Sequence, residues 1–131
     1  MLDEAKATRK PFSLVLCDVD FFKRINDEFG HAAGDEALKA IVRLWQLNTR
    51  QVGRDKGPLD GHLARIGGEE FAVTLPGSRL ERAVRVADRI RKTIEKTTIK
   101  FESRSFNITA SFGATELLPS DQSLDDMFRR A

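Results

Sequence analysis

The order of hydrophobic patterns along the chain restricts the possible folds more than any other feature. Residues 12–19, FSLVLCDV, are rich in Val, Leu and Phe and are typical of a buried strand. From Asp35 onward the apolar residues recur at helical spacing, at Leu38, Ile41, Val42 and Trp45. HLARI (62–66) and FAVTLP (71–76) then flank GGEE, residues 67–70, which predicts a hairpin.

A second helix is predicted over residues 78–96, with Ser78 as its cap. Its expected apolar face consists of Leu80, Ala83, Val84, Ala87, Ile90 and Ile94. Residues 100–105 show no regular pattern, and residues 106–117 are typical of a strand or a hairpin. Residues 124–131 predict the start of a last helix.

The predicted connections complete the topology. Residues 21–34 are expected to form a loop with a short helical turn, and the first helix should fade near Gly53 into the polar connection 53–61. Strand, helix, strand, strand, helix, strand is the order of an α+β, ferredoxin-like split βαβ sheet with helices on one face. A right-handed crossover makes the first two strands parallel, and the hairpin makes the third strand antiparallel to both.

This topology predicts a cluster of acids. If the third strand lies between the first two, Glu69 and Glu70 at its start lie beside Asp18 and Asp20 at the end of the first. Like charges about 4 Å apart repel by roughly 4 kcal/mol at an effective dielectric of 20. Either a raised pKa or a divalent cation would relieve that repulsion, and oxygen ligands suit Mg²⁺ or Mn²⁺. A solvated hairpin tip is the alternative interpretation of GGEE.

The loop after the first strand adds groups suited to a nucleotide, because Mg²⁺ usually shares its ligand shell with phosphates. The backbone N–H groups near Phe21 and Phe22 and the cation of Lys23 can bind phosphate oxygens. Asn26 and Asp35 offer the donor and acceptors needed to read a guanine edge. The alternative is an amphipathic turn whose aromatic residues belong to the core.

Size and composition favour one domain, 1–131, in a reducing and therefore cytoplasmic compartment. The chain has 131 residues, 40% of them hydrophobic, and its single Cys17 lies in an apolar run that predicts a buried structural thiol. No apolar run approaches the roughly 20 residues of a membrane span. The formal net charge of +2 gives no indication of a nucleic-acid partner.

Three blocks of the sequence resemble one family: LCDVDFFKRINDEFGHAAGDEALKAI, ARIGGEEFAVTLPG and ITASFGAT. Together they resemble the GGDEF domain of diguanylate cyclases over residues 12–131. The resemblance implies a palm-type sheet like that of class III nucleotide cyclases, and condensation of two GTP into cyclic di-GMP with loss of pyrophosphate. It also implies two Mg²⁺ or Mn²⁺ ions per site, a homodimer that can be transient, and an upstream regulatory domain in the parent protein.

The resemblance assigns roles by position. Asp18, with the carbonyl of Val19, matches a metal ligand; Glu69 matches a metal ligand that activates the 3′-hydroxyl, and Glu70 matches an invariant glutamate near the metals. All three acids are therefore catalytic candidates. The GTP-binding candidates are Phe21, Phe22, Lys23, Asn26, Asp35, Gly67 and Gly68.

The chain departs from the family pattern in three places. No D-x-L-T-G-L-x-N-R segment precedes MLDEAKATRKPF, and the last helix stops before the expected phosphate-binding lysine and arginine. We therefore expect a chain trimmed at both ends, with weaker GTP binding. GRDKGPLDGHLAR, residues 53–65, holds no R-x-x-D, so a tight inhibitory product site is expected to be absent, although Arg89 matches an arginine that assists it.

Other functions stay open from the sequence. A catalytically weak regulator that binds GTP or cyclic di-GMP would share this fold, whereas an RNA-binding module would need stacking aromatics that the strands lack. Arg65 could approach a phosphate or pair with a surface acid, His31 is expected to pack in its loop, and His62 should start a strand in an exposed position. The basic residues Arg79, Arg82, Arg85, Arg89 and Lys92 predict a solvated helix face.

Overall fold

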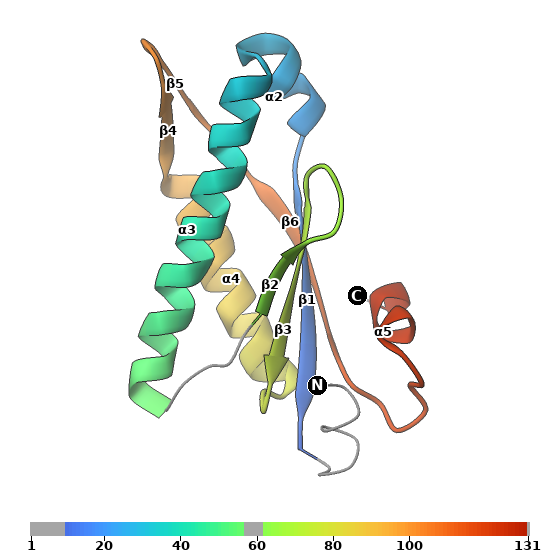
Figure 1. The fold of residues 1–131 in the computed structure, drawn as a ribbon. Helices are drawn as coiled ribbons and strands as arrows, with labels where there is room; N and C mark the ends of the chain where they lie inside the picture. Colours follow the sequence, from blue (N-terminus) through green and yellow to red (C-terminus); the bar gives the residue numbers. More distant parts are fainter. Residues whose placement is uncertain (1–9, 57–61, 131) are drawn as a thin grey trace.

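The computed structural model describes residues 10–56 and 62–130, which form a sheet with helices on both faces (Figure 1). Its elements are, in order, β1 (Phe12–Val19), α2 (Phe22–Phe29), α3 (His31–Lys56), β2 (His62–Arg65), β3 (Glu70–Pro76), α4 (Leu80–Lys96), β4 (Thr98–Phe101), β5 (Arg104–Asn107), β6 (Ala110–Glu116) and α5 (Leu124–Arg130).

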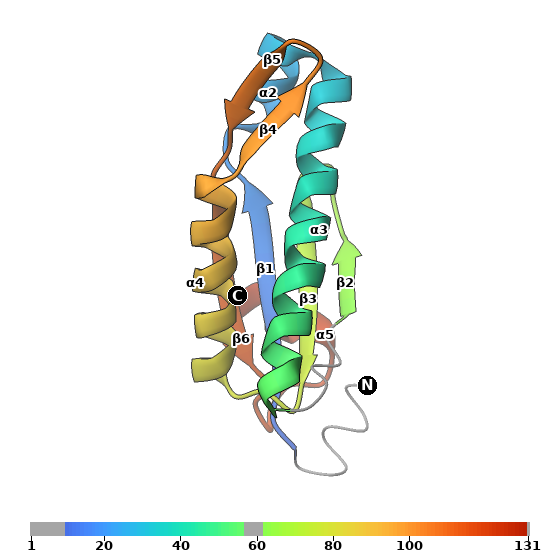
Figure 2. The same ribbon diagram turned by 90° about the vertical axis from the view of Figure 1, so that its left-hand side faces the viewer.

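The main sheet has the order β2-β3-β1-β6, and every neighbouring pair is antiparallel. Because β1 and β2 both run against β3, they are parallel to each other, and β3 lies between them as predicted. Helices α3 and α4 cover one face of the sheet, and α5 lies on the opposite face (Figures 1 and 2). The predicted α+β, antiparallel architecture is confirmed, but the prediction of helices on one face only is wrong, because α5 buries Met127 against the other face.

The sheet divides the core into two clusters. Alternate residues of β1, including Val15, Cys17 and Val19, face α3 and α4, where Trp45 is only 1% exposed. Phe12 and Leu14 belong to the cluster on the α5 face. Burying a large apolar side chain contributes roughly 1.5–3 kcal/mol, so the cluster under α3 and α4 supplies most of the stabilisation. The predictions of a buried Cys17 and a core Trp45 are confirmed.

The segment expected to be a loop is instead helix α2, and α3 begins at His31 rather than at Asp35. Ile25 is buried and Phe22 and Phe29 pack against the same core, which is a helical spacing that the sequence analysis missed. Gly30 separates the two helices with φ of 96°, and its N–H donates to the carbonyl of Asn26. Glycine adopts this positive φ without strain, so it ends α2 and the chain turns directly into α3.

The start and the apolar face of α4 also differ from the prediction. Ser78 does not cap the helix: it is buried before the first turn, and its carbonyl accepts a hydrogen bond of 2.7 Å from the Ser13 hydroxyl. The carboxylate of Glu116 on β6 instead accepts the Leu80 N–H at 2.6 Å. Val84 is 49% exposed although it was placed on the apolar face. The residues of α4 that are buried are Ala83, Val86, Ala87, Ile90 and Ile94.

A second, two-stranded sheet was not predicted. β4 and β5 pair antiparallel across the segment that was expected to be irregular. The turn between them includes Glu102 at φ of 56°. Glycine usually occupies such a position, and because this turn has none, the sequence did not predict it. The predicted strand or hairpin over 106–117 is therefore divided between the end of β5 and the whole of β6.

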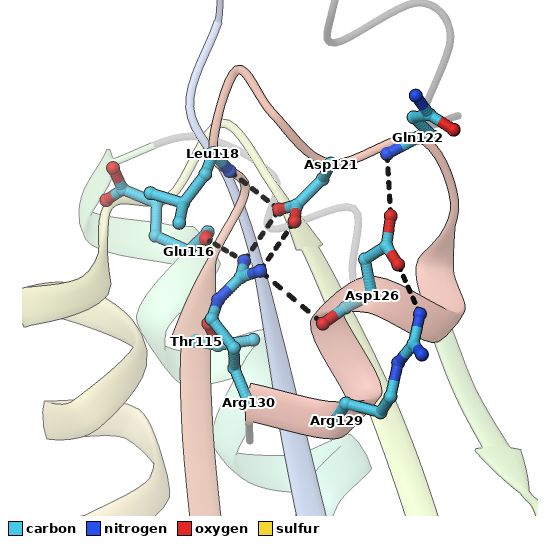
Figure 3. A network of polar contacts seen from close by, with 8 residues as sticks. All are labelled: Thr115, Glu116, Leu118, Asp121, Gln122, Asp126, Arg129 and Arg130. Carbon is cyan, nitrogen blue, oxygen red and sulfur yellow. Dashed lines mark hydrogen bonds and ion pairs between the residues drawn. The ribbon is translucent and has the colours of Figure 1, made fainter.

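Helix α5 is held against the sheet by packing and by a polar network (Figure 3). Met127 is fully buried in the cluster with Phe12 and Leu14. Arg130 donates to both carboxylate oxygens of Asp121, which is 2% exposed, and to the carbonyl of Glu116 at 3.0 Å. Paired geometry of this kind compensates the burial of a carboxylate. The two contacts fix α5 on the face opposite α3 and α4.

Candidate functional site

The end of β1 and the start of β3 meet at one corner of the sheet. Asp18 is the cross-strand partner of Glu70 in the antiparallel β1–β3 pair, so their side chains lie on the same face. One residue further on, the N–H of Val19 donates to the carbonyl of Glu69 at 3.2 Å. Figure 1 shows the β2–β3 loop beside β1 at the end of the sheet that carries α2. The predicted approach of the β3 acids to the end of β1 is therefore present for the pair Asp18 and Glu70, with Glu69 as the next residue of the turn.

The electrostatics of this corner differ between its two aspartates. Burial and then the charges of Glu69, Glu70 and Asp20 raise the pKa of Asp18 above its usual value. Asp20, in contrast, accepts hydrogen bonds from the hydroxyls of Thr109 (2.8 Å) and Ser111 (2.6 Å). The carboxylate of Asp20 links the end of β1 to β6, whereas the carboxylate of Asp18 accepts no hydrogen bond from the described part of the chain.

The GGEE turn is fixed through its backbone carbonyls. Arg65 donates from Nε to the carbonyls of Gly67 and Gly68, both at 3.2 Å, and from Nη2 to Gly68 at 2.7 Å. The carbonyl of Glu70 accepts the N–H of Ile66 at 2.9 Å. The sequence leaves two roles open for Arg65, and the structure does not show the pairing with a surface acid, because the guanidinium binds the turn itself. A contact of Arg65 with a phosphate stays a prediction. No spacing rule in the sequence signals this role.

Neither glycine of the turn is required by the protein's own packing. A Cβ added to Gly67 would make ordinary contacts of 3.5 Å with the Glu70 side chain, and one added to Gly68 would meet nothing within 4 Å. Neither residue has a positive φ. A ligand that approaches the turn closely would still explain why both positions are glycine.

The start of α2 presents backbone donors and an exposed aromatic ring. Phe21 precedes the helix at φ of 56° and ψ of 34°, and its side chain is 75% exposed. A non-glycine residue in this conformation carries strain that is common at functional sites. Phe22 packs against the core while Lys23 is exposed, so the alternative that both aromatics are core is wrong for Phe21. The free N–H groups of a first helical turn attract anions.

Asn26 and Asp35 lie on neighbouring helices. The Oδ1 atom of Asn26 is buried and has no hydrogen-bond partner among the described residues. A Cβ added to Gly34, in the first turns of α3, would lie 2.0 Å from this oxygen. Asp35 is exposed and lines a cavity of about 650 Å³ together with Leu38 and residues of β2 and β3. The helices α2 and α3 thus hold the amide and the carboxylate at one end of the molecule.

Comparison with known proteins assigns the family. The family description "Diguanylate cyclase, GGDEF domain" matches residues 1–131. Diguanylate cyclase A of Treponema denticola is 37% identical over 107 residues, which are 82% of this chain and 27% of that protein. The chain belongs to the GGDEF family. Diguanylate cyclase VdcA of Vibrio cholerae is 40% identical over 124 residues, 91% of this chain and 33% of that protein. The chain therefore spans only about a quarter to a third of the length of these GGDEF relatives.

Solved GGDEF structures share the fold. The active GGEEF domain of a diguanylate cyclase from Vibrio cholerae matches with a TM-score of 0.86 and 32% identity, covering 98% of this chain and 76% of that one. The GGDEF domain of DgcB from Caulobacter crescentus, in complex with cyclic di-GMP, matches with a TM-score of 0.82 and 28% identity, covering 98% and 70%. Over residues 10–56 and 62–130, no helix combines the length and apolar character needed to cross a bilayer.

Other predicted positions of this GGDEF domain have mixed outcomes. His31 is exposed at the first residue of α3, so the prediction that it packs in a loop is wrong. Arg79, Arg85, Arg89 and Lys92 are exposed and Arg82 is partly buried, which confirms a largely solvated face. His62 begins β2, but its side chain lies outside the described residues. The segment that lacks R-x-x-D includes residues 57–61, which also lie outside them.

The acidic corner has carboxylate ligands suited to a divalent cation, but these ligands do not form a complete coordination shell. Among the described residues, no three His, Cys, Asp or Glu side chains converge closely enough to hold a metal ion by themselves. A cavity of about 210 Å³ lies beside the corner, lined by Asp18, Glu70, Ser111 and Gly113 among others. Two carboxylates with open space beside them fit Mg²⁺, which usually binds one or two carboxylates and completes its shell with water and phosphate.

Proposed function

We propose that this chain is a diguanylate cyclase domain, which condenses two GTP molecules into cyclic di-GMP and releases pyrophosphate. The observation that carries the proposal is the pairing of Asp18 with Glu70, next to Glu69, at the end of β1 that leads into the first turn of α2. Membership of the GGDEF family, with relatives named diguanylate cyclases, supports the reaction class.

Asp18 and Glu69, with the carbonyl of Val19, would hold the divalent cations, with Glu70 nearby. The pKa of Asp18 is raised by burial and by its acidic neighbours, which is the signature of charge that a bound cation would relieve. When bound, two Mg²⁺ or Mn²⁺ ions would neutralise the triphosphate and lower the pKa of the attacking 3′-hydroxyl. In this proposal Glu69 would accept the hydroxyl proton.

The remaining residues would hold the substrate. Backbone N–H groups after Phe21 and the ammonium of Lys23 would bind phosphate oxygens, because donors at a helix start favour anions. Asn26 would offer its amide, and Asp35 its carboxylate, to the guanine edge. Gly67 and Gly68 would let the triphosphate approach the turn, since packing within the protein requires neither glycine.

Product formation requires two such sites to face each other. Each domain would hold one GTP, and each 3′-hydroxyl must reach the α-phosphate of the other, which calls for a two-fold homodimer. We propose that the dimer is transient and that an upstream domain controls it in a cytoplasmic setting. The single-domain assignment 1–131 and the absence of a tight inhibitory site stay predictions.

The test is product formation by the full-length protein. It is incubated with GTP and Mg²⁺, and the products are separated by chromatography, beside Asp18→Ala, Glu69→Gln and a control, Glu81→Gln. Glu81 is an exposed acid on α4. We expect cyclic di-GMP from the wild type and the control, and a loss of at least about 100-fold in both site variants.

Other results would change the assignment. Equal product from all four proteins would refute the roles of Asp18 and Glu69. No product from any of them, together with stoichiometric GTP or cyclic di-GMP binding by calorimetry, would favour a GGDEF regulator without catalysis. The DgcB domain solved with cyclic di-GMP is a GGDEF structure of similar fold in which that ligand is bound.

A further inference from the structure

Helix α2 carries Lys23 and Asn26 but has few anchors of its own. Only Ile25 is buried among its residues, and no side chain caps its start. Isolated helices of eight residues are unstable in water, so tertiary contacts must set the position of α2. The question is which contacts do so at each end of the helix.

The β4–β5 hairpin contacts the last turn of α2. Arg104 on β5 donates from Nη1 to the carbonyl of Glu28 at 3.1 Å. The same guanidinium lies over the ring of Phe29, with Cζ 4.2 Å from the ring centroid. Phe29 has a second partner on β5, Phe106, whose ring stacks on it with centroids 4.6 Å apart and 24° between the planes. Glu28, Phe29, Arg104 and Phe106 are called the α2 clamp below.

The chemistry of the clamp suits a helix end. The carbonyls of a last helical turn lack intrahelical donors, and a cation near a helix C-terminus interacts favourably with the helix dipole. Arg104 supplies both the donor and the cation, and it adds a cation–π contact with Phe29. Both views place the hairpin at the same end of the molecule as α2 (Figures 1 and 2).

We propose that Arg104 is a positioning residue for the nucleotide, acting through α2. This rests on the proposed function, because Lys23 and Asn26 are taken to bind GTP. Arg104 binds the last turn of the helix that carries both residues, and the Asp18 corner belongs to β1 and β3 instead. Loosening the clamp should therefore weaken GTP binding and leave the chemical step unchanged. A purely structural role would lower the amount of folded protein without this separation.

The experiment uses the full-length protein with Arg104→Gln, Arg104→Lys and Phe106→Leu. Arg85→Gln is the matched control, because Arg85 is an exposed arginine on α4 with no hydrogen bond or ion pair in the described residues. GTP affinity is measured by calorimetry, and kcat and KM by product chromatography. Hydrogen exchange of residues 22–29, followed by mass spectrometry, reports the order of α2. Thermal melting confirms that each variant is folded.

For Arg104→Gln we expect KM and Kd for GTP to rise about 3- to 10-fold, kcat to stay within twofold, and exchange of residues 22–29 to speed up. Arg104→Lys should recover part of the affinity, since it keeps the charge but not the planar contact. Phe106→Leu should change KM in the same direction, and Arg85→Gln should change nothing.

The results separate this inference from the proposed function. If the wild type binds GTP and the clamp variants bind it equally well, the positioning role is refuted while the function stands. A fall in kcat at constant KM, or equal exchange in all variants, also refutes it. If the wild type neither binds GTP nor makes cyclic di-GMP, the proposed function fails whatever the variants do.

Discussion

Gly34→Ala tests the contact between α2 and α3 without any ligand. The added Cβ would lie 2.0 Å from Asn26 Oδ1, 3.1 Å from Asn26 Cγ and 3.2 Å from Phe22 Cζ. Real Cβ atoms do not approach this closely, so Asn26 must rotate or α2 must shift. Overpacking of this kind costs about 1–3 kcal/mol. Alanine favours a helix interior over glycine by about 0.8–1.0 kcal/mol, so the net loss of stability should be about 0–2 kcal/mol.

A double-mutant cycle isolates the clash. In an Asn26→Ala background the obstructing amide is gone and only the 3.2 Å approach to Phe22 Cζ remains, so Gly34→Ala should be neutral or stabilise the protein by up to about 1 kcal/mol. The substitution should therefore be less unfavourable in this background than in the wild type, measured by urea unfolding of the four proteins. The same destabilisation in both backgrounds would refute the geometry. In the wild-type background, Gly34→Ala should also weaken GTP binding more than tenfold, because Asn26 is displaced.

Three further predictions concern stability. The native state holds the proton of Asp18 more tightly than the unfolded chain does, so its charge costs stability at neutral pH and that cost disappears as pH falls toward 3.8. Asp18→Asn should therefore raise the melting temperature at pH 7, with a smaller gain near pH 3.8; an equal gain at both values would contradict the assignment. Burial, then the charges of Asp18 and Asp20, raises the pKa of Cys17 from 9.0 to about 12. The native thiol should thus resist alkylation at pH 8, and stability should fall as pH rises above 9, as a melting series can show. Met127→Ala, in a fully buried position, should cost about 2–5 kcal/mol in urea unfolding.

Much of the central sheet could be predicted because each strand has a local pattern. Residues 12–19 form β1 with the predicted bounds, and the hairpin around GGEE is present. The hairpin β4–β5 could not be predicted in this way. Its strands have four residues each, and Phe106 packs on Phe29, which comes from α2. Packing of this kind depends on residues far away in the chain, and no local pattern records it.

The same division holds for the candidate site. Strand topology was enough to bring Asp18 near Glu70, because the end of one antiparallel strand lies beside the start of its neighbour. The positions of Arg65, Gly34 and Arg104 could not be read from residue type. Arg65 and Arg104 bind backbone carbonyls, and Gly34 leaves room for the Asn26 amide because a Cβ at this position would clash with it. Backbone carbonyls are present at every residue, so the sequence gives no sign of which ones are bound.

Asp18 and Asp20 are two residues apart, but their carboxylates differ in hydrogen bonding. This difference indicates which of the two could bind a ligand. Two hydroxyls donate to Asp20, which makes it a structural acceptor. Asp18 receives no such donor from the described residues, and its acidic neighbours raise its pKa. Arg65, the arginine of the adjoining turn, donates its hydrogen bonds to backbone carbonyls and not to these carboxylates. Repulsion among close carboxylates is therefore best relieved by a cation from outside the chain, and phosphates that accompany it would complete the charge balance.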